Sequence, residues 1–328
     1  MRKAIVAAVL ILLSSSGIAQ YRLDKLYQDA RTELYRNNYP LSISKFDLLI
    51  SLQPLQFDYY FLRGIGKYYL EDFLGAELDF SEVIKLNNYH TEAFHYRALV
   101  RDNLGRYYDA LSDHNRAIEL KVDNGELYSD RALNKLYSQN FKGAIEDCEK
   151  AIENKLVNAT IYLCKGAAWQ GLKEFDKALT DYNKAIALNP FNGNAFVRRA
   201  MLKHDMKRFE EALSDFNIAL KMDSANSYAY FQRGITKFDN NDLTGALADY
   251  NKVLSIDPLN SLTLYNRAML WIKKGNKKAA IEDINKVVKI NPDNILAIYD
   301  RGKLRHEMND FKRALQDYDK TIALYPYL

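Results

Sequence analysis

Histidine and cysteine, the side chains that most often bind metals or act as nucleophiles, are few and scattered in this sequence of 328 residues. The five histidines are His90, His95, His114, His204 and His306. None of them has a second histidine or a cysteine three or four residues away, the spacing that puts two ligands on one helix face. The sequence also contains no glycine-rich phosphate loop and no nucleophile elbow of the form G-x-S-x-G. We therefore predict no metal site, no cofactor and no enzymatic activity.

The chain has two cysteines, Cys148 and Cys164. A disulfide between them is one interpretation, because the N-terminus described below indicates export to a compartment that permits disulfides. We favour a structural interpretation, in which Cys148 is a small core residue and Cys164 is a half-exposed neighbour.

Charged residues follow a regular pattern along most of the chain. Eight times, a basic residue is followed by an aspartate at one fixed spacing, and the pairs themselves recur at a constant interval. An unpaired charge between two packed helices would be costly, so we predict structural ion pairs. An arginine row for phosphate is disfavoured, because each basic residue has its own acid. The pairs are Arg63 and Asp79, Arg97 and Asp113, Arg131 and Asp147, Lys165 and Asp181, Arg199 and Asp215, Arg233 and Asp249, Arg267 and Asp283, and Arg301 and Asp317.

The segment before the first of these pairs, residues 23–56, reverses the signs, with Asp29 at the basic position and Lys45 at the acidic one. We expect Asp29 and Lys45 to form the same ion pair. A second basic series follows one helical turn after the first. Its long stems are expected to lie over the helices with their charged heads in water, and a basic track for an acidic ligand is the alternative. The series is Lys67, Arg101, Lys135, Lys203, Lys237 and Arg305.

The charged pairs belong to a repeat that runs through residues 23–328 without an insertion, and residues 159–192 show the pattern of one copy clearly. Apolar residues recur at helical spacing from Phe175 to Leu188, and Pro190 ends that helix. A shorter apolar stripe before it predicts a first helix. Positions are counted from the first residue of each repeat, so that Ala159 is position 1 of residues 159–192. Position 8 of every repeat is alanine or glycine, which allows the two helices to approach closely.

In period, small residues and helix-ending prolines, these segments resemble the tetratricopeptide repeat, a helix–turn–helix unit of about 34 residues. The resemblance implies an all-α fold, in which antiparallel helix pairs stack into a right-handed superhelical solenoid. One helix pair has only one face to bury, so each repeat needs its neighbours to fold. The nine predicted repeats cover residues 23–56, 57–90, 91–124, 125–158, 159–192, 193–226, 227–260, 261–294 and 295–328.

Residues 1–19 differ from the rest of the chain. A basic pair precedes an apolar run from Ala4 to Leu13, and small residues follow up to Ala19. This order is typical of a secretory signal peptide, so residues 1–19 are predicted to be removed and the mature chain to be periplasmic or secreted. An uncleaved anchor is the alternative, but the apolar stretch is shorter than the ~20 residues that span a bilayer.

The charge balance gives no reason to expect nucleic acid or an anionic membrane as a partner. The chain has 46 basic and 42 acidic residues, and removal of Arg2 and Lys3 with the signal peptide leaves 44 against 42. Nucleic-acid-binding proteins instead concentrate basic residues in a patch or stripe. We predict no nucleic-acid partner and no stable membrane insertion after cleavage.

The resemblance also implies a function. Members of this family generally bind a partner segment in a concave groove lined by positions 2, 5, 9, 12 and 13 of the first helices. In this chain those positions are aromatic or aliphatic near both ends and more mixed in the middle. The residues predicted to bind in the groove are Tyr27, Phe61, Tyr68, Phe231, Phe238, Tyr265, Ile272 and Tyr299.

The predicted function is a non-enzymatic scaffold that binds a segment of another protein. Some family members clamp a C-terminal carboxylate with lysine and asparagine at positions 5 and 9. No repeat here has either residue at position 5, so such a clamp is not expected. A small amphipathic ligand or a glycan on the aromatic rings is the alternative. A peptide should need several repeats for affinity, whereas a small ligand should need one aromatic cluster.

Overall fold

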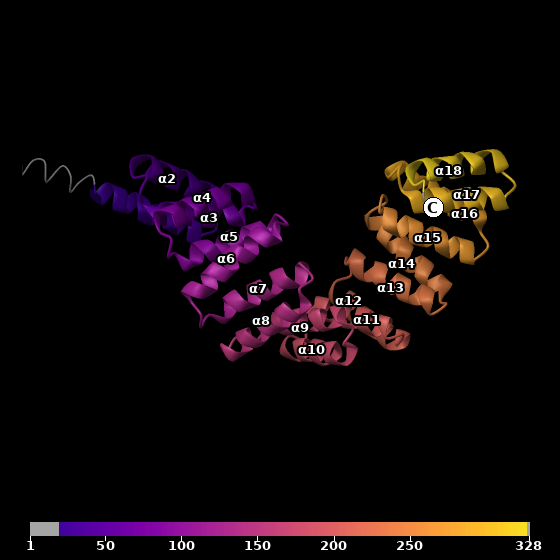
Figure 1. The fold of residues 1–328 in the computed structure, drawn as a ribbon, viewed down its shortest axis with the longest axis horizontal. Helices are drawn as coiled ribbons and strands as arrows, with labels where there is room; N and C mark the ends of the chain where they lie inside the picture. The colour runs from indigo at the N-terminus through magenta and orange to yellow at the C-terminus, as the bar shows by residue number, and fades with distance from the viewer. Residues whose placement is uncertain (1–19, 327–328) are drawn as a thin grey trace, which may run out of the picture. The chain divides into compact units, whose positions relative to one another are not determined.

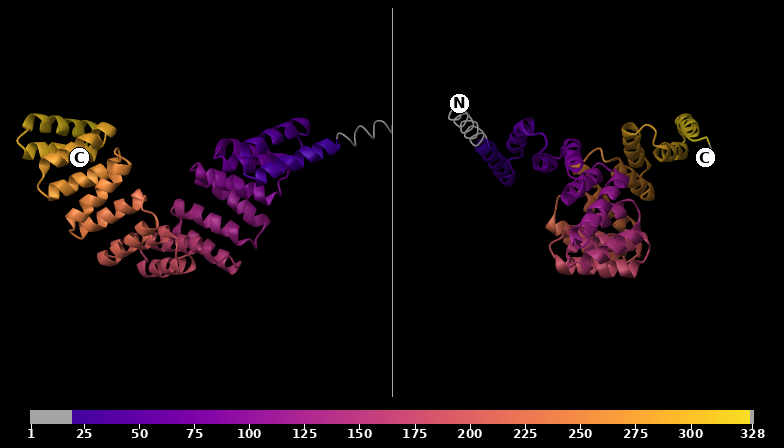
Figure 2. Two further views of the ribbon diagram at one scale, coloured as in Figure 1. Left: turned by 180° about the vertical axis from the view of Figure 1, so that it is seen from behind. Right: turned by 60° about the vertical axis from the view of Figure 1, so that its left-hand side comes forward.

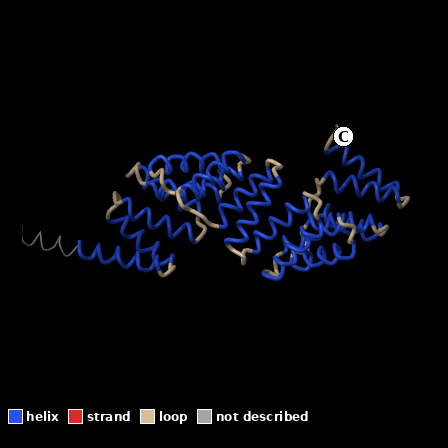
Figure 3. Tube along the Cα trace, turned by 90° about the horizontal axis from the view of Figure 1, so that it is seen from below, coloured by secondary structure: helices blue, strands red, loops and turns tan. Residues whose placement is uncertain are grey.

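The computed structural model describes residues 20–326, and within them the chain consists of helices and connecting turns with no strand (Figure 3). The predicted all-α fold of helix pairs is confirmed. The predicted signal peptide, residues 1–19, lies outside the described residues. The chain divides into two compact bodies, Met1–Leu172 and Lys173–Leu328, and each is described by itself.

The N-terminal body begins with a helix over residues 20–35 and continues through eight labelled helices (Figure 1). From α3 on, each first helix begins at position 1 of a predicted repeat, and each second helix begins at position 17. The labelled helices are α2 (Tyr39–Leu52), α3 (Phe57–Tyr69), α4 (Phe73–Leu86), α5 (Thr91–Asn103), α6 (Tyr107–Leu120), α7 (Gly125–Tyr137), α8 (Phe141–Glu153) and α9 (Ala159–Gly171).

The C-terminal body begins with a second helix, α10, and continues through four complete helix pairs (Figure 1). Within residues 20–326, no helix is long and apolar enough to cross a membrane. The helices are α10 (Phe175–Leu188), α11 (Gly193–Asp205), α12 (Phe209–Met222), α13 (Ser227–Asp239), α14 (Leu243–Ile256), α15 (Ser261–Lys273), α16 (Lys277–Ile290), α17 (Ile295–Glu307) and α18 (Phe311–Leu324).

Two local devices set the helix ends in each repeat. Asparagines at position 34 cap the next first helix. Asn226, for example, accepts a hydrogen bond from the backbone N–H of Ala229 at 2.9 Å. Position 15 lies between the two helices of a repeat and has a positive φ throughout the described chain, which reverses the chain direction. Only Gly105 and Gly275 are glycines there, so most repeats hold a side chain in this left-handed conformation.

The distance between the two helices of a repeat is set by the residues at positions 8 and 24. Gly234 lies against the ring of Tyr250, and a Cβ on that glycine would be 2.7 Å from a ring carbon. Where position 8 is alanine, position 24 is never tyrosine. In the next repeat, for example, Ala268 and Ile284 pack in one fully buried cluster. Tyrosine at position 24 therefore occurs only opposite glycine, which leaves room for its ring.

Within each body, the first helices of neighbouring repeats also pack on one another. In the N-terminal body α3 contacts α5, α5 contacts α7 and α7 contacts α9, and in the C-terminal body α11 contacts α13 and α13 contacts α15. Second helices pack instead on the first helix of their own repeat and of the next. Figure 2 shows the helices of each body from two further sides. The side of each body on which the first helices lie is called here the first-helix face.

The matched sizes at positions 8 and 24 predict the effect of a methyl group. Gly234→Ala should lower stability by about 1–3 kcal/mol, because the new Cβ overlaps the Tyr250 ring. Adding Tyr250→Ile, which copies the Ala268 and Ile284 combination, should recover most of the loss. Urea denaturation of the full chain and a double-mutant cycle measure both effects. Additive losses from the two changes would mean that these positions do not set the spacing.

Candidate functional site

An arginine on the first helix of most repeats clamps a buried aspartate on the second helix. In seven repeats, Nε and Nη2 of the arginine at position 7 donate to the two carboxylate oxygens of the aspartate at position 23, over 2.5–3.0 Å. These aspartates are only 1–3% exposed. The paired hydrogen bonds satisfy a charge that would be costly to bury alone. The pairs are Arg63–Asp79, Arg97–Asp113, Arg131–Asp147, Arg199–Asp215, Arg233–Asp249, Arg267–Asp283 and Arg301–Asp317.

The same arginines connect each repeat to the one before it. Nη1 of Arg233 donates to Asn217 of the preceding repeat at 2.7 Å, and Nη1 of Arg267 donates to Asn251 at 2.6 Å. The Arg233 guanidinium also lies over the Tyr230 ring, 5.3 Å from its centre. One arginine therefore joins its own two helices and the neighbouring repeat.

Arg63 contacts two carboxylates, because its Nη1 donates to Asp47 at 2.6 Å in addition to the two bonds to Asp79. Burial disfavours the charged form of this guanidinium. The hydrogen bonds and charges of Asp79 and Asp47 outweigh burial and raise the pKa of Arg63. The contacts of Arg63 therefore favour the charged form of its guanidinium.

The second basic series, at position 11, does not end in water, and the expectation from the sequence was wrong. In all six cases a side-chain nitrogen lies 2.7–2.9 Å from the aspartate at position 23 of the same repeat. These side chains are only 12–19% exposed. In these six repeats the buried carboxylate therefore receives donors from both position 7 and position 11. The charged groups at position 11 therefore form ion pairs within their own repeat. This argues against a basic track that binds an acidic ligand.

The sign-reversed pair of the first repeat is not formed. Asp29 is exposed, and no ion pair joins it to Lys45 in the part of the chain that the structure describes. Aspartate is much shorter than arginine, so from position 7 it does not reach the second helix. The remaining predicted pair, Lys165 and Asp181, has its members in different bodies and stays a prediction. Lys165 itself lies 3.0 Å from Glu149 of the preceding repeat.

In the N-terminal body, the predicted groove residues Tyr27, Phe61 and Tyr68 are half-buried on the first-helix face. Their rings pack against other rings. Tyr27 lies 5.4 Å from Tyr59, and Tyr96 lies 5.9 Å from Phe61 and 5.8 Å from Tyr68, all between ring centres. Burial is the main cause that raises the pKa of Tyr68. Each ring therefore offers only part of its surface to a partner.

In the C-terminal body, the predicted groove residues differ widely in exposure. Phe231 is 8% exposed and packs in the core, 6.3 Å from the Tyr250 ring centre. The prediction that Phe231 lines an open groove is therefore corrected, because its ring fills the space beside the second helix. Tyr299, by contrast, is 45% exposed. It is the most accessible of the predicted groove residues in this body.

Tyr265, Phe238 and Ile272 are half-buried on the same face. The hydroxyl of Tyr265 donates to Asp300 of the next repeat at 2.6 Å. Burial and this hydrogen bond raise the pKa of Tyr265. The ammonium nitrogen of Lys273 lies over the Phe238 ring, 4.7 Å from the ring centre. Tyr265 and Phe238 therefore have structural contacts of their own besides any role in binding.

The two cysteines are free thiols, and both are buried in the same cluster. Cys148 lies in the core as expected, but the half-exposed position expected for Cys164 was wrong, because its side chain also enters the core between α8 and α9. The hydrogen bond with Cys164 and burial raise the pKa of the Cys148 thiol. A buried thiol of this kind is a poor nucleophile.

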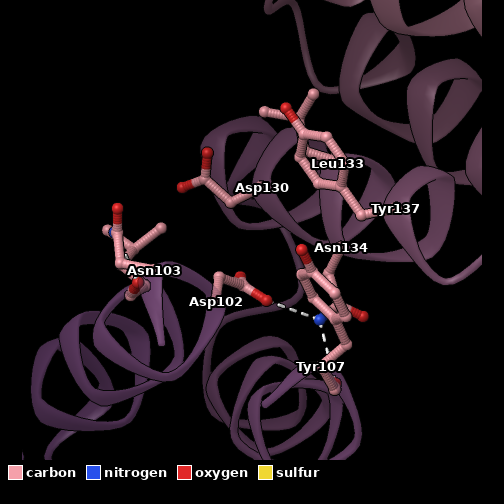
Figure 4. A pocket seen from close by; sticks show the side chains of 8 residues that line it. Asp102, Asn103, Tyr107, Asp130, Leu133, Asn134 and Tyr137 are labelled. Carbon is pink, nitrogen blue, oxygen red and sulfur yellow. Dashed lines mark hydrogen bonds between the residues drawn. The ribbon is translucent and has the colours of Figure 1, made fainter. Parts of the chain in front are cut away.

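Between α5 and α7, the first-helix face of the N-terminal body is hollowed into a cavity of about 350 Å³ (Figure 4). We call it the Asp102–Asp130 cavity. Two carboxylates, two amides and two phenol rings from α5, α7 and the start of α6 surround it. These residues are Asp102, Asn103, Tyr107, Asp130, Asn134 and Tyr137.

Hydrogen bonds from neighbouring side chains hold both carboxylates of the cavity. Asp102 accepts from the amide of Asn134 at 2.6 Å and lies 2.8 Å from a ring nitrogen of His114, and Asp130 lies 2.6 Å from a ring nitrogen of His95. Asp130 and Asn134 stand at positions 6 and 10, so the groove positions alone did not identify them. The signal was available at Asn134 and His114, which are polar residues at core positions.

Sequence comparison identifies the repeats. The family profile described as tetratricopeptide repeat matches residues 159–192 and 261–294, and a further profile with the same description matches residues 197–261. The first two matches coincide with two of the predicted repeats. Residues 159–192 and 197–294 thus match the tetratricopeptide repeat family, and the helix pairs of the described chain fit tandem repeats of this kind. None of the curated proteins matches it.

Solved tetratricopeptide repeat structures share this fold. A tetratricopeptide repeat protein from Parabacteroides merdae is 17% identical and has a TM-score of 0.63, with 79% of this chain and 98% of that chain covered. The C-terminal part of a tetratricopeptide repeat protein from Cytophaga hutchinsonii is 19% identical with a TM-score of 0.53, covering 72% of this chain and 97% of that one. A chain of the APC/C hetero-tetramer Cut9–Hcn1 is 12% identical with a TM-score of 0.58, covering 87% of this chain and 56% of that chain.

The arginine clamp predicts different losses in two adjacent tetratricopeptide repeats. After Arg233→Met, Asp249 keeps Lys237 at 2.8 Å, so the loss should be about 1–3 kcal/mol. After Arg267→Met, Asp283 keeps only Lys286 at 3.9 Å, so the loss should approach about 3–5 kcal/mol. Chemical denaturation of the full chain measures both losses.

The matched control for this comparison removes the stranded charge itself. Asp283→Asn added to Arg267→Met should recover part of the loss, because the buried carboxylate is then neutral. Equal losses for the two arginine variants would show that position 11 does not share the work of holding the aspartate.

Proposed function

We propose that this chain is a non-catalytic scaffold that binds a segment of another protein along its first-helix face. The observation that carries the proposal is a set of large apolar side chains at positions 2, 5 and 13 of the first helices that remain 45–72% exposed. Five of the seven are tyrosines, a residue type enriched among those that dominate binding energy. The set is Tyr35, Tyr69, Tyr137, Tyr228, Leu262, Leu296 and Tyr299.

The family supports this role in a general way. The tetratricopeptide repeat fold indicates a scaffold for protein–protein interaction. The internal chemistry supports it further, because the arginine clamp and the basic residues at position 11 are engaged with buried aspartates. Most of the side chains that the first-helix face leaves for recognition are therefore aromatic, amide-bearing or acidic. A partner segment lying along this face would meet several repeats in turn.

The proposal predicts a loss of partner capture when the first-helix face is changed. Tyr299→Ala combined with Ile272→Ala should reduce capture at least about tenfold, because an exposed aromatic anchor such as Tyr299 often contributes about 2 kcal/mol and half-buried Ile272 adds apolar surface on the same face. The immobilised full chain captures partners from the envelope or secreted fraction of the source cells, and mass spectrometry quantifies them. The melting temperature of the variant should fall only slightly, since neither side chain is fully buried.

Tyr108→Ala is the matched control, because Tyr108 is an exposed tyrosine on the second helix α6. It should leave capture unchanged. Full capture by a folded double variant would contradict binding on this face. Capture of a small amphipathic molecule or a glycan by one aromatic cluster, with no protein retained, would favour the alternative ligand class.

We further propose that the chain is exported and that residues 1–19 are removed. The basic start, the apolar run and the small residues before Gln20 support cleavage near Ala19. N-terminal sequencing of protein purified from the source cells should find a mature chain that begins near Gln20 in the soluble extracytoplasmic fraction. Retention of Met1 in a membrane pellet would contradict this proposal.

A further inference from the structure

The Asp102–Asp130 cavity has an acidic lining with no basic residue in it. The nearest basic residues of the same helices are engaged elsewhere. Arg101 donates to Glu77 at 2.8 Å and to Asp113 at 2.7 Å. The ammonium nitrogen of Lys135 lies 2.7 Å from a carboxylate oxygen of Asp147. The repeats therefore neutralise their structural aspartates but leave the two carboxylates of the cavity without an arginine or lysine.

Two hydrogen-bond acceptors at the cavity have no partner in the described chain. Asp130 uses Oδ2 toward His95, and its Oδ1 is open. Asn134 is 1% exposed, and although its nitrogen donates twice, its buried Oδ1 accepts no hydrogen bond. The amide nitrogen of Asn103 donates one of its two N–H groups to the backbone carbonyl of Leu99. The donors of the lining are the second N–H of Asn103 and the hydroxyls of Tyr107 and Tyr137, and the oxygen acceptors of Asp102, Asp130, Asn103 and Asn134 outnumber them.

The walls of the cavity suit a long side chain that ends in a flat cation. The rings of Tyr107 and Tyr137 are stacked, with centres 6.0 Å apart and planes at 19°. An aromatic face attracts a guanidinium or ammonium group. Leu99 and Leu133 add apolar surface against which the methylene stem of such a side chain can lie.

We infer that the Asp102–Asp130 cavity binds a basic side chain, arginine in preference to lysine, presented by the partner segment. Its guanidinium supplies five donors in a plane, which matches two carboxylates better than a single ammonium does. The inference rests on the proposed binding role of the first-helix face, and it adds the chemistry of one anchor residue. The partner segment should carry an arginine where it crosses α5 and α7.

A divalent cation is the other ligand that oxygen acceptors can hold. Within residues 20–326, no group of three or more histidine, cysteine, aspartate or glutamate side chains is placed to hold a metal ion. The two carboxylates are also each held by a histidine ring. These contacts favour an organic cation with directed N–H donors over a metal ion.

The test titrates N-acetyl-arginine amide into the full chain and follows the side-chain amide signals of Asn103 and Asn134 by NMR. N-acetyl-citrulline amide is the neutral isostere and serves as the control ligand. We expect saturable shifts with the arginine probe and at least about tenfold weaker binding of the citrulline probe, the difference that one charge pair makes. Equal binding of the two probes would overturn the inference, as would shifts produced by Ca²⁺ with none produced by arginine.

The variant Asp130→Asn keeps the shape of the side chain and should weaken the arginine probe about tenfold. Asp123→Asn, in the exposed turn before α7, is the matched control and should bind as the unchanged chain does. Unchanged binding by Asp130→Asn would also overturn the inference. The capture experiment at Tyr299 lies in the other body, so loss of capture there without arginine binding here would refute this inference alone.

Discussion

The structure depends on the burial of one aspartate per repeat. From α3 onward, every complete helix pair that lies within one body has a carboxylate at position 23 that is nearly inaccessible to solvent. The buried charge is tolerated because the arginine at position 7 supplies two parallel N–H donors. In most of these repeats the basic residue at position 11 supplies a third donor. The arginine that satisfies it also donates backward to position 25 of the preceding repeat, and in five of the seven repeats it lies over an aromatic ring at position 4. These contacts are directional, unlike apolar packing. The register of each hairpin is therefore fixed by the same group that fixes its register against its neighbour.

This arrangement determines what the first-helix face can recognise. Basic residues outnumber acidic ones in the sequence, yet those of the first helices at positions 7 and 11 are drawn toward the second helices by the buried aspartates. What remains on the face is largely aromatic and amide-bearing, acidic around Asp102 and Asp130, and basic only locally, as at Lys273 and Lys303. The overall charge of the chain thus says little about the surface that faces a partner. A search for partners with acidic segments would follow the composition and ignore the contacts.

The repeat period was enough to predict the helices and the arginine–aspartate pairs, because both depend on residues at fixed spacing within one repeat. Predictions that depended on side-chain reach or on depth of burial were less secure. Asp29 and Lys45 have complementary charges, but an aspartate is too short to span the gap that an arginine spans. Phe231 stands at a groove position, yet its ring is buried beside Tyr250, and Cys164 is buried because α8 and α9 pack closely. These outcomes depend on three-dimensional packing between elements, which single positions in a sequence do not report.

The Asp102–Asp130 cavity shows where a repeat sequence carries its specific information. His114 and Asn134 replace small or apolar residues at core positions in two adjacent repeats, and each forms a hydrogen bond to Asp102. Burying polar groups in a core lowers stability unless they are fully paired, and Asn134 and His114 each retain a buried atom without a partner. A repeat built only for stability would keep the apolar residues found in the other copies. The two departures are instead placed so that they hold one carboxylate at a hollow of the first-helix face, which is what a site for a cationic anchor requires.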